Sequence, residues 1–308
     1  MLGIMLKQLF LDSADEEDVS ASYASAREIW EKLDEAACIF TRELPLLHGE
    51  ETITTVASRQ SYDLPGGFIN LYLQNRRSQF ILKYYDGSNY SFPVLAPYEQ
   101  IYRENTTDEQ TWPNKFAIRD KEDKETLVTG TATAAGAETN GQCTLTDATK
   151  LFTTTNRVWP RDIIYNSSQS SMGYVLSVTD ATHLVVALFD ADGAADSITL
   201  GDSYIIQPAS KQQLYFDAPS ESAGHIIYVP YLCLPDPVYS DLGMWRFSPE
   251  TCKAIVSGAT ALFKTPKKEY KEASQLGSLF AQELSRKRKE VGMQKLRSRG
   301  TRNAMWPA

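Results

Sequence analysis

The chain has 308 residues, of which 42% are apolar, so it can bury a full core and is long enough for two domains. No apolar run reaches the length of about 18 residues that a membrane-spanning helix needs. Residues 1–11 lack the charged start and the cleavage site of a signal peptide. The composition therefore predicts a soluble, cytoplasmic protein. Its four cysteines have no metal-binding spacing, which indicates buried free thiols; they are Cys38, Cys143, Cys233 and Cys252.

Charge is distributed unevenly along the chain. The overall net charge is −8, but residues 286–302 contain eight basic residues and one acid, Glu290, whereas the remainder holds 23 basic and 38 acidic residues. A block of like charge repels itself and stays solvated, which is typical of an interaction tail. The basic residues are Arg286, Lys287, Arg288, Lys289, Lys295, Arg297, Arg299 and Arg302.

The partner of this tail could be nucleic acid or protein. Clustered Lys and Arg gain affinity for nucleic acid by releasing counterions from phosphates. The acidic remainder of the chain, with an overall pI near 5.1, would however repel a duplex. The tail also carries Met305 and Trp306, and Trp, Met and Arg are enriched in buried protein interfaces, which favours a protein partner. A frayed, solvated terminus is the alternative.

An amphipathic helix is predicted after the acidic stretch 12–18. Ser25 and Glu28 have the spacing of a capping box, although Ser20 or Ser22 could equally start the helix, and Pro45 ends it. Its apolar face is formed by residues that recur at steps of three and four: Tyr23, Ala26, Trp30, Leu33, Ala37, Phe40 and Leu44.

Strands follow this helix. Alternation or β-branched content predicts them at 52–62, 69–73, 80–85 and 115–119, with a short helical turn at 97–102. Asp86 and Gly87 predict a hairpin turn, which explains the tyrosines Tyr84, Tyr85 and Tyr90 more simply than an aromatic platform for a sugar or a base does.

The middle of the chain predicts a small all-β barrel or sandwich. It is rich in Thr, Ala, Gly, Ser and Asp, and its short strands are expected at 143–145, 162–165, 173–178, 183–188 and 203–206. We interpret this region as an insertion, because residues 116–119 and 213–216 resemble the two ends of one interrupted hairpin or meander.

Beyond the insertion, residues 214–216 and 225–231 alternate as an antiparallel pair joined by the turn-rich 217–224. Ser248, Pro249 and Glu250 then supply an N-cap, a first-turn proline and a first-turn acid. The helix that they predict breaks at Thr265 and Pro266, and a second helix runs into the basic tail. The apolar face of the first is Cys252, Ile255, Val256, Ala259, Leu262 and Phe263, and that of the second is Tyr270, Ala273, Leu276, Phe280 and Leu284.

Enzyme motifs are missing from the sequence. No GxSxG, HExxH, Walker or GxGxxG pattern occurs, so we expect no enzyme activity, no cofactor and no metal. His48, His183 and His225 are expected as surface or half-buried residues. Asp190 and Asp192 have the opening spacing of a calcium loop, but Thr199 stands where that loop needs glutamate, which favours a turn.

The expected fold class is α+β. Helices from the N- and C-terminal segments form a core with an antiparallel β layer, a small all-β barrel or sandwich is inserted, and an extended basic arm ends the chain. The expected divisions are an N-terminal part of the core at 1–126, the insertion at 127–208, a C-terminal part of the core at 209–285 and the arm at 286–308.

The order of these signals resembles the head-to-tail connector, or adaptor, proteins of tailed bacteriophages. The resemblance covers roughly residues 20–120 and 210–290. It rests on Leu33-Asp34-Glu35-Ala36-Ala37, Gln60-Ser61-Tyr62-Asp63-Leu64-Pro65, Phe68-Ile69-Asn70-Leu71-Tyr72, Pro113-Asn114-Lys115-Phe116-Ala117-Ile118, Ile226-Ile227-Tyr228-Val229-Pro230-Tyr231 and Ser248-Pro249-Glu250. The insertion departs from the minimal family pattern, but residues 152–153, 161–166 and 201–204 resemble a β module of several phage structural proteins.

The resemblance implies a virion protein of the neck, assembled in the host cytoplasm and not bound to a membrane. Such proteins form a ring of twelve copies beneath the portal, pass double-stranded DNA and receive a tail or nozzle protein. It further implies that residues 286–302 dock on the portal and that Trp306 anchors the tail in an apolar pocket. An acidic body suits a channel through which DNA must slide, although an ordinary soluble surface explains it equally. The alternatives are a carbohydrate-binding or hydrolytic tail protein that uses the inserted domain, and a nucleic-acid-binding protein that uses the basic tail.

Overall fold

The computed structural model describes residues 1–15, 24–72, 82–104, 108–120, 127–210 and 212–303. It confirms a mixed α+β protein, with five helices and several sheets among these residues. The chain divides into two compact units, one made of Met1–Pro45 and Val238–Ala308 and the other of Leu46–Pro237. None of the described helices combines the length and the apolar content that crossing a bilayer requires.

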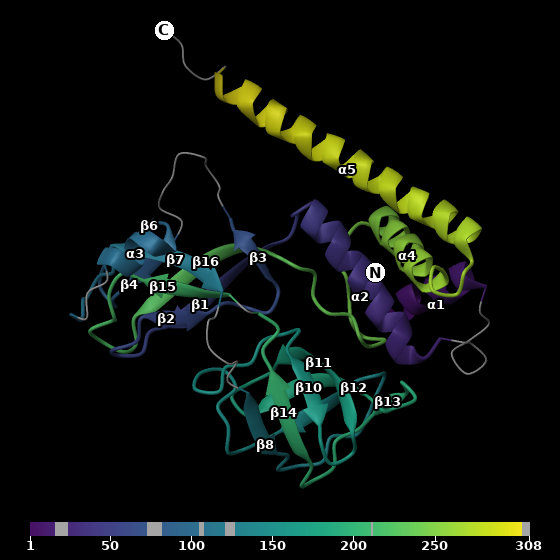
Figure 1. The fold of residues 1–308 in the computed structure, drawn as a ribbon, viewed down its shortest axis with the longest axis horizontal. Helices are drawn as coiled ribbons and strands as arrows, with labels where there is room; N and C mark the ends of the chain where they lie inside the picture. The colour runs from purple at the N-terminus through teal and green to yellow at the C-terminus, as the bar shows by residue number, and fades with distance from the viewer. Residues whose placement is uncertain (16–23, 73–81, 105–107, 121–126, 211, 304–308) are drawn as a thin grey trace. The chain divides into compact units, whose positions relative to one another are not determined.

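Helices from both ends of the chain form the first unit (Figure 1). They are α1 (Gly3–Ala14), α2 (Ala26–Glu43), α4 (Pro249–Lys264) and α5 (Tyr270–Asn303). Helix α4 packs against the other three. Edge-to-face aromatic pairs fill the contacts, with ring centroids 5.4 Å apart for Phe10 and Phe263 and 5.9 Å apart for Phe40 and Phe280.

Two of these helices begin where the sequence predicts. The Ser25 hydroxyl accepts a hydrogen bond of 3.2 Å from the Glu28 backbone N–H, which identifies Ser25 as the N-cap of α2. Ser248 caps α4 in the same way through the Thr251 N–H, and Pro249 occupies the first turn. In both cases a short polar side chain satisfies a backbone donor that the helix itself leaves unpaired.

Helix α1 was not expected from the sequence. No side chain caps its start; instead the Gly3 and Ile4 N–H groups donate to the Gly243 and Asp241 carbonyls, at 2.7 and 3.1 Å. The acceptors lie more than 200 residues away in the chain, so only tertiary contact supplies the helix start.

The second unit contains a pair of sheets around one core. One sheet has the strand order β1-β16-β4-β5, with β3 also pairing with β16, and the other has the order β2-β15-β7-β6. Buried side chains from both sheets belong to the same cluster, including Leu214 and Phe216 from β15 and Ile227 and Val229 from β16. The elements are β1 (His48–Thr54), β2 (Ser61–Asp63), β3 (Phe68–Leu71), β4 (Lys83–Tyr85), β5 (Tyr90–Ser91), β6 (Val94–Leu95), α3 (Tyr98–Glu104), β7 (Lys115–Asp120), β15 (Gln212–Phe216) and β16 (Ile226–Cys233).

The predicted pairing of 214–216 with 225–231 is wrong. Strand β15 pairs with β2 and β7, whereas β16 pairs with β1, β3 and β4 in the other sheet. Because β16 already has neighbours on both edges, no ladder of hydrogen bonds remains for β15. Residues 217–224 therefore connect two sheets instead of closing a hairpin.

The predicted interrupted pair is confirmed. Strands β7 and β15 are antiparallel, with Phe116 opposite Phe216 and Arg119 opposite Gln213. The β4–β5 hairpin is also confirmed, since Tyr85 pairs with Tyr90 across the turn that begins at Asp86. Residues 80 and 81 of the strand predicted there lie outside the described residues.

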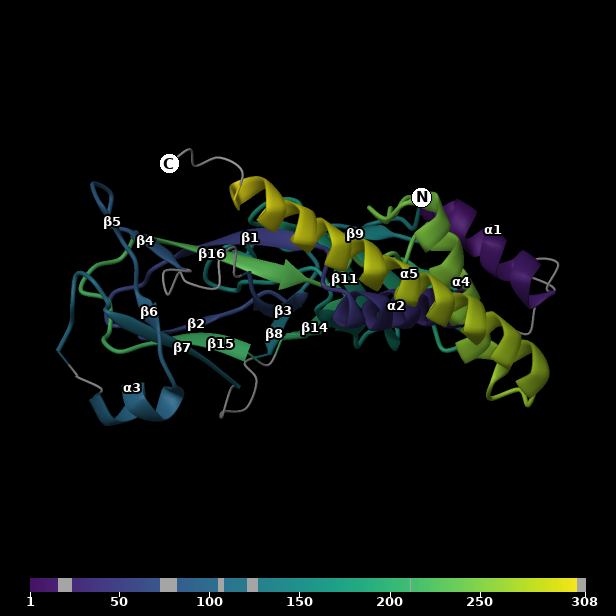
Figure 2. The ribbon, with the colours of Figure 1, turned by 90° about the horizontal axis from the view of Figure 1, so that it is seen from above.

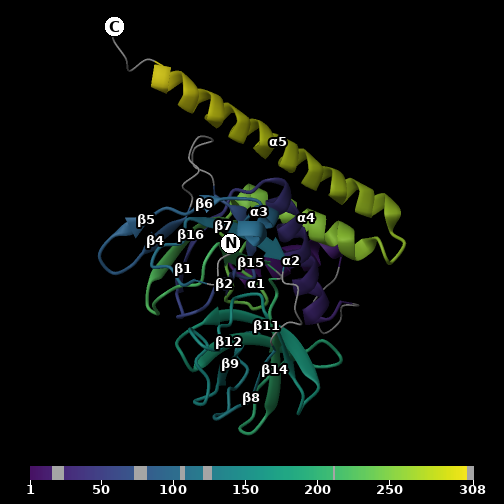
Figure 3. The ribbon, with the colours of Figure 1, turned by 60° about the vertical axis from the view of Figure 1, so that its left-hand side comes forward.

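Between β7 and β15, a third sheet curls into a half-barrel (Figure 3). Its order is β13-β12-β11-β10-β14-β8, with β9 pairing with β12, and an isolated bridge from Ala134 to Thr146 brings the end of β8 towards β9. Each of the five strands predicted here is present. The strands are β8 (Val128–Thr131), β9 (Cys143–Thr146), β10 (Ile163–Asn166), β11 (Ser171–Val178), β12 (His183–Phe189), β13 (Ala195–Asp196) and β14 (Ser203–Gln207).

Two arginines join the half-barrel to neighbouring segments of its unit. Arg157 donates to the Glu51 carboxylate at 2.7 Å and to the Thr52 carbonyl at 2.8 Å, and its guanidinium lies 4.2 Å from the ring centre of Trp159. Arg161 donates to the Pro235 carbonyl at 2.7 Å. Burial raises the pKa of Glu51 although Arg157 opposes this shift, and the side chains of Arg157 and Glu51 are 25% and 23% exposed, so the pair is partly shielded from water.

Gly173 is essential to the close packing of β11 on β12, because a Cβ atom there would lie 1.7 Å from the Ala187 carbonyl oxygen. We expect Gly173→Ala to lower the free energy of unfolding by about 3 kcal/mol, since backbone must move to admit the methyl group. Gly67→Ala is the matched control, because its nearest neighbours would lie 3.8 Å away. Calorimetry of both variants is the measurement, and equal stability of the two would contradict the packing described here.

Candidate docking site on helix α5

All eight basic residues of the charge block lie within helix α5. The segment expected as an extended arm is therefore helical as far as Asn303, which corrects the sequence-based expectation. Side chains are described for Arg286, Lys287, Arg288 and Lys289, while Lys295, Arg297, Arg299 and Arg302 are placed only by their helical backbone. Trp306, the predicted apolar anchor, lies outside the described residues.

The helical state has a local cause. Arg, Lys, Gln, Leu and Glu are strong helix formers because their unbranched stems lose little rotamer freedom in a helix. Glu283, Arg286 and Glu290 are spaced three and four residues apart, so they lie on one face and can form ion pairs along it. These pairs offset the repulsion among the neighbouring cations, which is the effect that predicted an extended arm.

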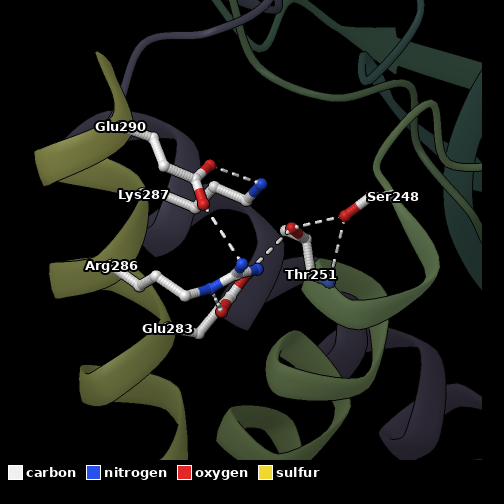
Figure 4. Close-up of polar contacts among 6 residues, drawn as sticks. All are labelled: Ser248, Thr251, Glu283, Arg286, Lys287 and Glu290. Atoms are coloured by element: carbon white, nitrogen blue, oxygen red, sulfur yellow. Dashed lines mark hydrogen bonds and ion pairs between the residues drawn. The ribbon is translucent and has the colours of Figure 1, made fainter. Parts of the chain in front are cut away.

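A polar network fixes the base of the basic segment to α4 (Figure 4). The Arg286 guanidinium donates two hydrogen bonds to the Glu283 carboxylate, at 2.7 and 2.8 Å, and a third of 3.1 Å to Glu290. Thr251, in the first turn of α4, donates its hydroxyl to Glu283 at 3.2 Å. The Thr251 hydroxyl also lies 3.0 Å from the hydroxyl of Ser248, the residue that caps α4. Through Thr251, Glu283 therefore connects this helix cap with Arg286, the first arginine of the charge block.

The electrostatics of this network follow from its geometry. The bidentate hydrogen bonds from Arg286 are the main reason that the pKa of Glu283 lies below its usual range, and they outweigh the opposing effect of burial. The same carboxylate raises the pKa of Arg286. The Glu283 side chain is 11% exposed and that of Arg286 is 50% exposed, so the carboxylate is held inside while the cation still faces solvent.

Two further cations of the block have described partners. Lys287 donates to Glu290 at 2.9 Å, and Arg288 forms an ion pair with Glu43 at the end of α2. Within the described part of the chain, Lys289 has no ion-pair partner. Exposed ion pairs are worth about 0–1 kcal/mol in water, so Lys287 and Arg288 can exchange these partners for others at little cost.

A shallow groove lies beside this network, between α4 and α5. Its volume is about 360 Å³. Small residues on α4 form its floor, the half-exposed Leu279 forms one wall, and Lys253 and Arg286 supply positive charge. The groove is lined by Lys253, Ala254, Ser257, Leu279, Gln282, Glu283 and Arg286, and we call it the α4–α5 groove.

Other polar clusters are used within the fold. The Tyr84 hydroxyl lies 2.9 Å from His225 Nδ1 and 3.1 Å from the Ser220 hydroxyl, but it is buried in the core between the two sheets. Asp202 is almost fully buried and accepts hydrogen bonds from Asn166 and from the Thr199 backbone, and these lower its pKa although burial opposes the shift. Such satisfied networks indicate a structural role.

His183 and the acidic residues Asp180 and Asp190 belong to local turns. His183 Nδ1 lies 2.8 Å from Asp180 on an exposed hairpin. Asp190 accepts from the backbone N–H groups of Asp192 and Ala194, as the predicted turn requires. Among the residues that the structure describes, no three His, Cys, Asp or Glu side chains gather as ligands for a metal ion.

Comparison with known proteins gives no relative: no protein-family model matches the chain, and no curated protein sequence matches it.

Sequence reasoning missed the acidic side of this site. It counted the cations of the charge block but did not see that Glu283 and Glu290 bracket Arg286, nor that Thr251 belongs to the same network. The i, i+3 and i, i+4 spacings around Arg286 were a readable signal, because extending the predicted helix from Leu284 to Glu290 brings these side chains to one face. The contact of Glu43 with Arg288, which spans 245 residues, had no local signal.

Glu283 should stabilise the first unit in a pH-dependent way. Folding lowers its pKa, so its contribution is present above the unfolded value of about 4.5 and is lost as the pH falls through the folded-state pKa. We expect Glu283→Gln to lower the Tm at pH 7 by roughly 2 °C and the difference from the wild type to shrink at pH 3. Circular dichroism melts from pH 3 to 7 test this. Glu290→Gln, at a carboxylate 37% exposed, should have a smaller effect, and equal effects would contradict the assigned role of Glu283.

Proposed function

We propose that this chain is a virion structural protein that joins the portal to the tail of a tailed bacteriophage as a ring of copies. In this proposal the basic part of helix α5 docks on the portal ring, a tail or nozzle protein binds the opposite side, and double-stranded DNA passes through the ring. The proposal extends the sequence resemblance to connector proteins. It also locates the protein in the neck of the virion.

The observation that carries the proposal is that the basic residues lie on a continuous helix. Residues 286–303 continue α5 as one helix, which corresponds to about 27 Å at 1.5 Å per residue. Helix α4 has 16 residues and α5 has 34, so α5 continues beyond the length that α4 can cover. A helix that is held at Glu283 and carries eight cations suits a groove on another molecule better than a solvated tail would.

A helix that is already formed also favours tight docking on the portal. A disordered arm must be ordered when it binds, and each immobilised side chain and residue then costs free energy. Because α5 is already helical, its partner has to immobilise the side chains alone. An acidic groove of the portal would pair with Lys289 directly and with Lys287 and Arg288 by exchange of their present partners.

The finer architecture fits the same proposal. The four helices of the first unit would form the helical core of a connector, the pair of sheets its β layer and the half-barrel an inserted module. Arg157 holds this module to β1 and Arg161 holds it to the Pro235 carbonyl, so it would be a fixed part of the ring and not a tethered appendage.

Docking can be tested by mass photometry of the chain mixed with the portal ring of the same bacteriophage. We expect the full chain to add the mass of many subunits to the portal and a chain ending at Ser285 to add none, because the truncation removes all eight cations. The truncated chain keeps Phe280 and Gly258, so circular dichroism should show it folded.

Two charge-reversal variants, one inside and one outside the basic block, give a matched comparison for docking. Lys289→Glu should weaken portal binding, whereas Lys271→Glu, at an exposed position near the start of α5, should leave it unchanged. If neither the full chain nor the variants add mass to the portal, the proposed function fails.

Duplex DNA separates the proposal from a nucleic-acid-binding function. The body of the chain is strongly acidic, so we expect weak binding with a shallow dependence on salt. A DNA-binding α5 would instead lose affinity steeply, with a slope of about −0.9 for each phosphate contact. Fluorescence anisotropy with a duplex at several salt concentrations measures this slope. A slope steeper than about −5 that disappears in the chain ending at Ser285 would favour DNA as the partner.

A further inference from the structure

Exposed apolar side chains gather at the start of α1. An isolated bridge places Leu2 opposite Met244, and the Gly3 N–H donates to the Gly243 carbonyl at 2.7 Å, so the first residues of α1 and residues 242–244 lie side by side. The exposed fractions of the large apolar residues here are 45% for Leu2, 54% for Ile4, 54% for Met5, 56% for Leu242 and 55% for Met244. We call these five residues the α1 patch.

The patch lies on the face of α1 that the core does not use. Leu6, Phe10 and Leu11 on the other face are buried, and Phe10 packs on Phe263 of α4. Five half-exposed large side chains amount to a few hundred Å² of apolar surface, the size at which such patches mark interaction sites. The exposed half of these side chains therefore adds to stability only when another surface covers it.

The α4–α5 groove has the complementary properties. Its small α4 residues leave room beside Leu279, which is 51% exposed. Its α5 wall runs from residue 279 to 286, about 10 Å along the helix, which is the length of two turns of an incoming helix. Glu283 on the same wall is paired with Arg286, so the positive charge that the groove offers is that of the exposed Lys253.

Acidic side chains flank the α1 patch. Asp12 is exposed on α1, two turns beyond Met5, and Asp241 precedes Leu242. Asp241 is paired with Lys7 at 2.8 Å, whereas Asp12 accepts only from the neutral Gln8 among the described side chains. The patch thus adds an exposed carboxylate at Asp12 to its apolar residues, and the groove adds an exposed cation at Lys253 to its apolar wall.

The two surfaces cannot meet within one molecule. Helices α1 and α5 pack on different sides of α4 (Figures 1 and 2). We infer that the α1 patch of one copy packs into the α4–α5 groove of a second copy, with Ile4 and Met5 against Leu279 and Asp12 towards Lys253. The contact uses two different surfaces, so each copy can bind one neighbour through its patch and another through its groove.

This contact supplies the subunit interface of the proposed ring. That the copies close into a ring rests on the proposed function. A patch of a few hundred Å² is below the roughly 800 Å² per partner of a standard stable interface. A single pair is therefore weak in solution. In a closed ring every copy uses both its patch and its groove, so each copy is held by two contacts instead of one. The assembly is therefore more stable than a single pair although the type of contact is the same.

Disulfide trapping between two differently tagged proteins tests the contact without the portal. Both proteins carry Cys233→Ser, because Cys233 is the native thiol that is only partly buried. One protein carries Met5→Cys and the other Leu279→Cys. We expect the mixture to form a cross-linked heterodimer roughly tenfold faster than a mixture of Met5→Cys with Leu200→Cys, because the contact holds the first two thiols together. Leu200 is the control, since it is 70% exposed and lies outside both surfaces.

Two outcomes would overturn the inference. Equal cross-linking with Leu279→Cys and with Leu200→Cys would show that the groove does not receive the patch. Faster cross-linking of Met5→Cys with itself would show a symmetric contact of two patches instead. Portal binding by the parent chain is measured separately, so heterodimers that form without portal binding would keep this contact and reject the proposed function.

Discussion

The close approach of α5 to α4 is the constraint on which the candidate site depends. A Cβ atom on Gly258 would lie 2.7 Å from the Phe280 ring, so only glycine lets that ring sit on α4 and reach Phe40 on α2. This packing sets the position of Glu283, three residues further along α5, beside Thr251. The direction in which the basic segment leaves the helical unit thus follows from one missing side chain and one partly buried ring.

Acids and bases alternate at the root of the basic segment and then give way to bases alone. Glu283 and Glu290 compensate Arg286 and Lys287, whereas no acid follows between residue 291 and Asn303. The local ion pairs support the helix where it leaves its neighbours. A charge count by itself treats Arg286 and Lys289 as equivalent, but Arg286 is paired with two carboxylates, whereas Lys289 has no ion-pair partner among the described residues.

The β elements show how far local patterns reach. The alternation at β7 and β15 correctly predicted one ladder interrupted by an insertion, because the two ends carry matching aromatic residues, Phe116 and Phe216. The same kind of alternation wrongly paired β15 with β16. Pattern identifies a strand and its buried face, but the choice of neighbour depends on which edges other strands already occupy, and β1 and β4 occupy both edges of β16.

The sequence by itself determined the features with short-range causes: the cap at Ser248, the half-barrel strands, the α+β class and the position of the charge block. Tertiary structure decided what depends on distant partners. Helix α1 begins on carbonyls of residues 241 and 243, Arg288 meets Glu43, and the α1 patch and the α4–α5 groove each join segments far apart in the chain. Capping and alternation act over a few residues and are readable locally, whereas contacts across more than 200 residues exist only once the chain has folded.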